Sequence, residues 1–202
     1  MIRVLAVAIA LAVMVEPAQA HAPIKGIGAF YNGLLHPLFV PAHLLLIFAL
    51  GLLLGQHVPN ASRFGWLAFV AALWTGLVIG HLSGTGVPVM LLLLMALAAG
   101  LLVAVDWSVP AVVAAVLGGV AGFTIGMDSM PEALTRKETL LALAGTGVGA
   151  ALIVSYIGGV AAWLQVPWQR IGIRVAGSWA AASALLVIAL AFVGPKAPGS
   201  LP

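Results

Sequence analysis

The sequence has no cysteine and few charged residues. The missing cysteines exclude disulfides and thiolate sites for zinc or iron–sulfur clusters. Any bound metal must therefore use nitrogen, oxygen or thioether ligands. Only 6% of the 202 residues are charged, and the eight Lys and Arg residues are scattered along the chain. No basic surface for nucleic acid is expected from this distribution.

Motifs of common enzyme classes are also missing. No glycine-rich phosphate loop ends in Lys and Ser or Thr, so any ATP would have to be hydrolysed by another protein. Ser83, Ser129 and Ser178 form no convincing pair of nucleophile and base. The sequence predicts that this protein is not an enzyme and carries no prosthetic group.

What the chain has in abundance is apolar sequence. Hydrophobic residues make up 63% of it, and its mean hydropathy is +1.22, so the lipid bilayer must be its main solvent. Residues 87–105 are apolar throughout rather than alternately polar and apolar, which indicates helices. The predicted fold class is an all-α polytopic membrane protein.

Six apolar stretches are each close to the length that a membrane-crossing helix needs. Short links rich in glycine, proline and charged residues separate them, which predicts antiparallel neighbours in one six-helix transmembrane domain, residues 37–194. A tail, residues 195–202, would follow it outside. The predicted spans are residues 37–54, 65–81, 87–105, 109–127, 139–164 and 173–193.

Residues 1–20 have the pattern of a cleavable signal peptide. Arg3 precedes an apolar run, and Pro17 precedes Ala18-Gln19-Ala20, so cleavage after Ala20 would leave His21 as the mature N-terminus. The alternative is an uncleaved anchor helix. Both place residues 21–36 outside, which predicts a bacterial inner-membrane protein whose mature N-terminus faces the periplasm. Four tryptophans would then lie near cytoplasmic helix ends: Trp66, Trp107, Trp163 and Trp168.

Glycines recur at a spacing of four residues in three predicted spans. This spacing lets helix backbones approach closely in lipid. The glycines concerned are Gly76, Gly80 and Gly84, then Gly118, Gly122 and Gly126, then Gly145 and Gly149.

All five histidines lie between positions 21 and 81. Ionisable residues next to membrane spans are functional candidates by default. The antiparallel topology gathers most of the candidates at the external side, where a mature N-terminal histidine adds an α-amine to its imidazole. The predicted metal ligands are His21, His36 and His43, with His81, Asp128 and Glu132 in support.

His36 and His43 would lie about 10 Å apart along a straight helix, too far to share one ion. Pro37 and Pro41 could interrupt the helix and bend the two rings together, or simply start it. The other candidates also have alternatives. His81 could cap the end of its helix, and the acidic residues could solvate a loop.

The segment from His21 through Gly26 to Gly33, and then from His36 to Leu45, resembles the HupE/UreJ family of nickel and cobalt permeases. The order of signal peptide, mature N-terminal histidine and six helices is similar too. The family motif of the first helix is His, five residues, Asp, His. His36 and His43 fit its two histidines, whereas Ala42 replaces the aspartate. The resemblance is strongest over residues 18–56.

The resemblance and the histidines together predict a permease for a divalent metal, nickel or cobalt. Imidazole and amine donors suit both ions, although copper would bind them more tightly. Two alternatives stay open. One is a membrane accessory that holds metal or a partner during metalloenzyme maturation without transporting it, and the other is a purely structural membrane subunit.

Overall fold

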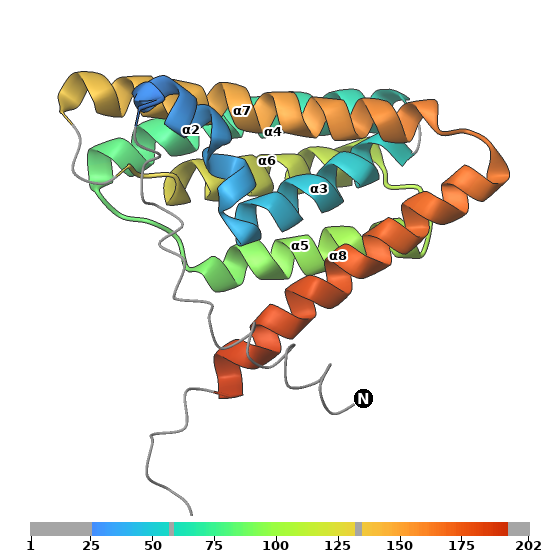
Figure 1. Ribbon diagram of the computed structural model, residues 1–202. Coiled ribbons are helices and arrows are strands. Elements are labelled where there is room, and N and C mark those ends of the chain that lie inside the picture. Colours follow the sequence, from blue (N-terminus) through green and yellow to red (C-terminus); the bar gives the residue numbers. More distant parts are fainter. Residues whose placement is uncertain (1–25, 57–58, 132–134, 194–202) are drawn as a thin grey trace, which may run out of the picture.

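The computed structural model describes residues 26–56, 59–131 and 135–193, and its regular structure there is entirely helical (Figure 1). The all-α prediction is therefore confirmed. The helices are α2 (Gly28–Phe39), α3 (Pro41–Gln56), α4 (Pro59–Ser83), α5 (Val89–Ala104), α6 (Ala111–Asp128), α7 (Arg136–Trp163) and α8 (Pro167–Val193).

Four of the described helices, α4, α6, α7 and α8, are long and apolar enough to cross a membrane. The pair α2 and α3, bent by 72° at a short break, makes a fifth candidate if it is one span. Helix α5 has only 16 residues, fewer than the roughly 20 that usually cross the hydrocarbon core. Over the described residues the structure therefore supports four or five candidate spans, and the predicted number of six is not confirmed. The predicted signal peptide and C-terminal tail lie outside the described residues.

The first predicted span is replaced by two helices. Helix α2 begins at Gly28, so most of the segment expected to be an external extension is helical, and it packs along α7. The break falls at Val40, which has φ −89° and ψ 109°. Pro41 causes it, because a proline disfavours the helical conformation in the residue before it. Pro37 lies inside α2 and does not interrupt it, so this part of the prediction was wrong.

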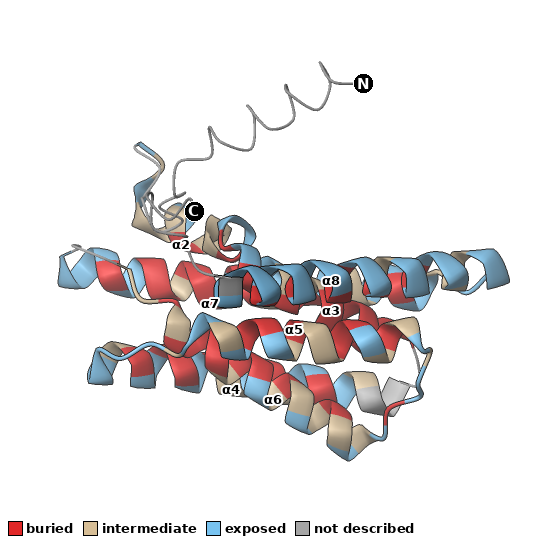
Figure 2. Ribbon diagram, turned by 90° about the horizontal axis from the view of Figure 1, so that it is seen from below, coloured by how far each residue is buried: buried red, intermediate tan, exposed pale blue. Residues whose placement is uncertain are grey.

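Helix α3 occupies the middle of the bundle (Figure 1). It packs against α5, α7 and α8, while α4 pairs with α6, α2 with α7, and α5 with α8. The sides of the helices that face one another are coloured as buried, and the outer sides as exposed (Figure 2). Many large apolar residues are among the exposed ones. Phe192 is 78% exposed and Trp179 is 72% exposed. Such an apolar exterior is what a lipid solvent requires.

Glycines allow two of these helix pairs to approach closely, as predicted. A β-carbon at Gly122 of α6 would lie 2.1 Å from the carbonyl oxygen of Phe69 in α4, and one at Gly145 of α7 would lie 2.1 Å from that of Phe30 in α2. Gly84 differs from the prediction. It follows the end of α4 with φ +65°, and a β-carbon there would meet nothing within 4 Å. Gly84 therefore serves the turn and not the helix packing.

The antiparallel order gives the bundle two distinct ends. The His43 end holds the start of α3 and the ends of α4 and α6, and the Gln56 end holds the end of α3 and the starts of α4, α6 and α8. The four tryptophans named above all lie toward the Gln56 end: Trp107, Trp163 and Trp168 are on or beside helix termini, and Trp66 is two turns into α4. Their predicted grouping at one end is confirmed.

Candidate functional site

A buried histidine and an aspartate meet at the His43 end. His43, in the first turn of α3, is fully buried. Its Nε2 lies 3.0 Å from Oδ2 of Asp128, the last residue of α6, whose side chain is 16% exposed. The contact joins residues 85 positions apart in the chain. It therefore connects the central helix to the α4–α6 pair.

The chemistry of the carboxylate assigns the roles within this pair. An ionised carboxylate can only accept hydrogen bonds, so Nε2 of His43 donates to it. The other ring nitrogen, Nδ1, is buried and has no hydrogen-bond partner among the described residues. In the neutral ring, Nδ1 carries a lone pair. A histidine whose second nitrogen is held by a carboxylate is the usual arrangement around a bound metal.

His36 lies beside this pair because of the bend between α2 and α3. The ring centroids of His36 and His43 are 5.3 Å apart, with their planes at 71° to each other. A continuous helix would have separated these residues by about 10 Å along its axis. The prediction that a break brings the two imidazoles together is therefore confirmed, and Pro41 provides the break.

The remaining predicted ligands are less closely placed. His81 lies two residues before the end of α4, at the same end of the bundle, where Gly80 packs on Met127 of α6. No hydrogen bond or ion pair joins His81 to His43 or Asp128 in the part of the chain that the structure describes. His21 and Glu132 lie outside the described residues.

The histidines and the aspartate do not form a complete coordination shell. Over residues 26–56, 59–131 and 135–193, no three His, Cys, Asp or Glu side chains converge as metal ligands would. The geometry offers two neighbouring imidazoles, one of them oriented by Asp128. An ion held there would need further ligands, such as water, so its binding would be weaker and more readily reversed than at a closed structural site.

The loop between α4 and α5 passes over Asp128. A β-carbon at Gly86 would lie 3.6 Å from Oδ1 of Asp128. The neighbouring Ser129 is turned away, because its hydroxyl donates to the carbonyl oxygen of Ile125 at 2.6 Å. Oδ1 therefore faces a loop residue without a side chain, which leaves room beside the carboxylate.

Sequence reasoning missed a second polar cluster, at the Gln56 end. The amide Nε2 of Gln56 donates to the carbonyl oxygen of Val103 at 3.1 Å and to Oδ1 of Asp106. Arg170 of α8 also donates to this carboxylate oxygen, at 3.3 Å. Asp106 has a φ of 58°, a left-handed conformation that aspartate tolerates better than most residues. The available signal was a glutamine that ends an otherwise apolar run.

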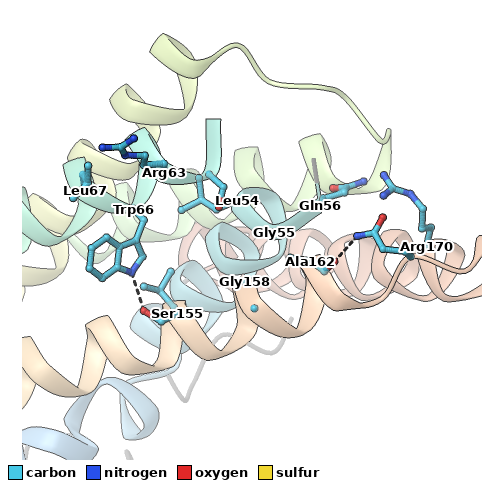
Figure 3. A pocket seen from close by; sticks show the side chains of 14 residues that line it. Leu54, Gly55, Gln56, Arg63, Trp66, Leu67, Ser155, Gly158, Ala162 and Arg170 are labelled. Carbon is cyan, nitrogen blue, oxygen red and sulfur yellow. Dashed lines mark hydrogen bonds between the residues drawn. The ribbon is translucent and has the colours of Figure 1, made fainter. Parts of the chain in front are cut away.

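A cavity of about 930 Å³ opens beside this cluster (Figure 3). On one side the indole of Trp66 donates to the hydroxyl of Ser155 at 2.8 Å, and on the other lie Gln56 and Arg170 (Figure 3). It therefore lies between α4 and α7, near the end of α3. Its lining also includes Leu54, Gly55, Ser62, Arg63, Leu67, Val154, Gly158, Gly159, Ala162 and Gln165.

Fold and site together define a helical membrane protein with a histidine–aspartate pair buried at the bend of a broken helix. The family model described as HupE / UreJ protein matches residues 9–187, so this chain belongs to the HupE/UreJ family. The resemblance found at His36 and His43 thus extends over most of the chain. No curated protein and no solved structure gives a significant match.

Proposed function

We propose that this protein is a membrane permease for a divalent transition metal, nickel or cobalt, and not an enzyme. The observation that carries the proposal is the buried Nδ1 of His43, which lacks a partner among the described residues while Asp128 holds the opposite nitrogen. A buried polar atom without a partner costs free energy, and a metal ion would supply the missing partner.

In this proposal the metal is the cargo, and Asp128 has a positioning role. His43 binds the ion through Nδ1, His36 supplies a second imidazole, and the carboxylate of Asp128 fixes the ring of His43. His21, His81 and Glu132 remain the proposed additional ligands. Incomplete coordination suits transport, because a transported ion must bind well enough to enter and weakly enough to leave.

Nickel or cobalt is proposed because the donors are imidazoles without thiolates, and family membership favours the same ions. We also propose that the protein lies in the bacterial inner membrane with the His43 end toward the periplasm. The signal-peptide pattern of residues 1–20 supports this orientation.

The test is metal entry into liposomes that contain the purified protein. Nickel, cobalt, copper and zinc are compared for the unchanged protein, for His43→Gln and for Asp128→Asn. Glu138→Gln is a matched control, because it removes one carboxylate charge at the start of α7, at the same end of the bundle, and glutamine is accepted at this capping position.

We expect entry of nickel or cobalt into liposomes that contain the unchanged protein. Entry should be lost in His43→Gln and kept in Glu138→Gln. It should fall about tenfold in Asp128→Asn, because the partners that orient metal ligands typically contribute a factor of this size. Metal binding without entry would overturn the permease and favour the accessory role in metalloenzyme maturation. If neither metal binding nor metal entry is observed, the structural membrane subunit is favoured.

A further inference from the structure

The cavity at the Gln56 end has a lining of mixed character that differs from the His43 site. Leu54, Leu67 and Val154 give it an apolar wall, and Arg63 and Arg170 lie at its margins. It exists because α4 packs mainly on α6 and α7 mainly on α2, so the facing sides of α4 and α7 are not in full contact here. Figure 3 shows the arginines at opposite ends of this space.

The charge of this cavity favours an anion. Its lining contains two arginines and no Asp or Glu. Asp106 contacts Arg170 from outside the lining and balances one of the positive charges. Arg63, in the second turn of α4, is exposed, and its charge is not balanced by any residue of the lining. A divalent cation would be repelled here, so the cavity does not fit the metal cargo.

Gln56 supplies a second, independent requirement. Its side chain is 2% exposed and borders the cavity. Because its Nε2 donates to Val103 and Asp106, its orientation is fixed, and the carbonyl Oε1 is left as an acceptor without a partner among the described residues. A ligand that satisfies this oxygen would carry a hydrogen-bond donor as well as a negative charge.

The tryptophans place the cavity at the level of lipid headgroups. Trp66 is part of its lining, and Trp163 and Trp168, which are 79% and 70% exposed, flank the turn between α7 and α8. Tryptophans gather where the hydrocarbon core meets the headgroups. Basic pockets between transmembrane helices at this level bind anionic lipid headgroups.

We propose that this cavity binds an anionic phospholipid with hydroxyl groups on its headgroup, of the phosphatidylglycerol type. Arg63 attracts the phosphate, a headgroup hydroxyl donates to Oε1 of Gln56, and an acyl chain lies along Leu67 and Val154. A volume of about 930 Å³ accommodates a headgroup and the first part of a chain.

The test is native mass spectrometry of the full chain in an uncharged detergent, without added metal. Phosphatidylglycerol and phosphatidylcholine with identical acyl chains are titrated, and glycerol 3-phosphate is added as a competitor. Gly159→Leu fills the cavity, because a β-carbon at this lining residue meets nothing within 4 Å. Gly172→Leu is the matched control, since Gly172 of α8 is equally open but lies outside the lining.

We expect phosphatidylglycerol to bind about fivefold or more tightly than phosphatidylcholine, since one basic residue near the headgroups contributes about that factor. Arg63→Gln should remove most of this preference, whereas Arg136→Gln at the other end should keep it. Gly159→Leu should weaken phosphatidylglycerol binding and Gly172→Leu should not.

Equal affinity for the two lipids, or equal effects of the two leucine variants, would overturn the proposal. Displacement of the lipid by glycerol 3-phosphate at a similar concentration would also overturn it, because the site would then bind a free phosphate compound. None of these outcomes depends on metal transport, so the lipid proposal and the permease proposal can fail separately.

Discussion

Replacing Gly122 by alanine should force α4 and α6 apart. The added β-carbon would lie 2.1 Å from the carbonyl oxygen of Phe69 and 3.0 Å from the backbone nitrogen of Leu73. Both atoms belong to the backbone of α4, so no side-chain rotation can relieve the contact. Van der Waals contact requires the helices to separate locally by roughly an ångström, which also loosens the neighbouring contacts of this pair.

We expect this overpacking to lower the free energy of unfolding by about 1–3 kcal/mol. Gly119, three residues earlier in α6, is the matched control, because a β-carbon there would lie 3.9 Å from the side chain of Ala68, an ordinary contact. Alanine is the better helix former by up to about 1 kcal/mol. Gly119→Ala should therefore be neutral or stabilising, although it makes the same chemical change in the same helix.

The assay is thermal unfolding of both variants in one detergent, followed by the helical circular dichroism signal. A loss of this size should lower the midpoint of Gly122→Ala by several degrees, at roughly 2–4 °C per kcal/mol for a chain of this length. Equal midpoints for the two variants, or a lower one for Gly119→Ala, would show that the packing of α4 on α6 is not as described.

Two further predictions concern the two ends of α3. Pro41→Ala should let the helix continue through Val40 and move His36 away from His43. Nickel affinity measured by calorimetry should therefore fall about tenfold or more. Unchanged affinity would show that metal binding does not depend on the bend. Asp106→Ala should lower the thermal midpoint more than Asp106→Asn. The left-handed conformation at φ 58° costs about 1–2 kcal/mol for alanine, whereas asparagine tolerates it. Equal losses in the two variants would contradict this reasoning.

Composition was sufficient to predict the all-helical membrane fold. Pro37 and Pro41 left two possibilities, a bend that brings His36 and His43 together or a simple helix start, and the structure has the bend at Pro41. These features depend on local chemistry. Helix α2 was not predicted, because its stability comes from packing on α7, where Gly145 admits the backbone of Phe30. A single sequence does not reveal against which distant segment such a helix will pack.

The polar contacts show the same limit. Topology placed Asp128 at the same end as His43, but their direct contact depends on how the α4–α6 pair sits against α3. The cluster of Gln56, Asp106 and Arg170 requires three separate elements to meet. Nothing local in the sequence specifies such a meeting, so the residues were predicted only as parts of loops.

Helix α3 connects the two ends of the protein, and its sequence limits how a metal could cross. His43 and Gln56 are about 20 Å apart along its axis, and every residue between them is apolar or glycine. Leu46, Ile47 and Leu50 are buried in the core. An ion leaving His43 therefore finds no polar side chain of α3 along this length. Transport along this route requires α3 to move relative to a neighbouring helix.

The contact of α3 with α7 includes a close approach of two glycine-bearing backbones. A β-carbon at Gly55 would lie 2.1 Å from the carbonyl oxygen of Gly158, so the two backbones touch without large side chains between them. Interdigitated side chains resist sliding, whereas two glycine-lined backbones have few steric obstacles to it. In the proposed permease the packed leucine side of α3 closes this path, and few side chains interdigitate where Gly55 of α3 meets Gly158 of α7.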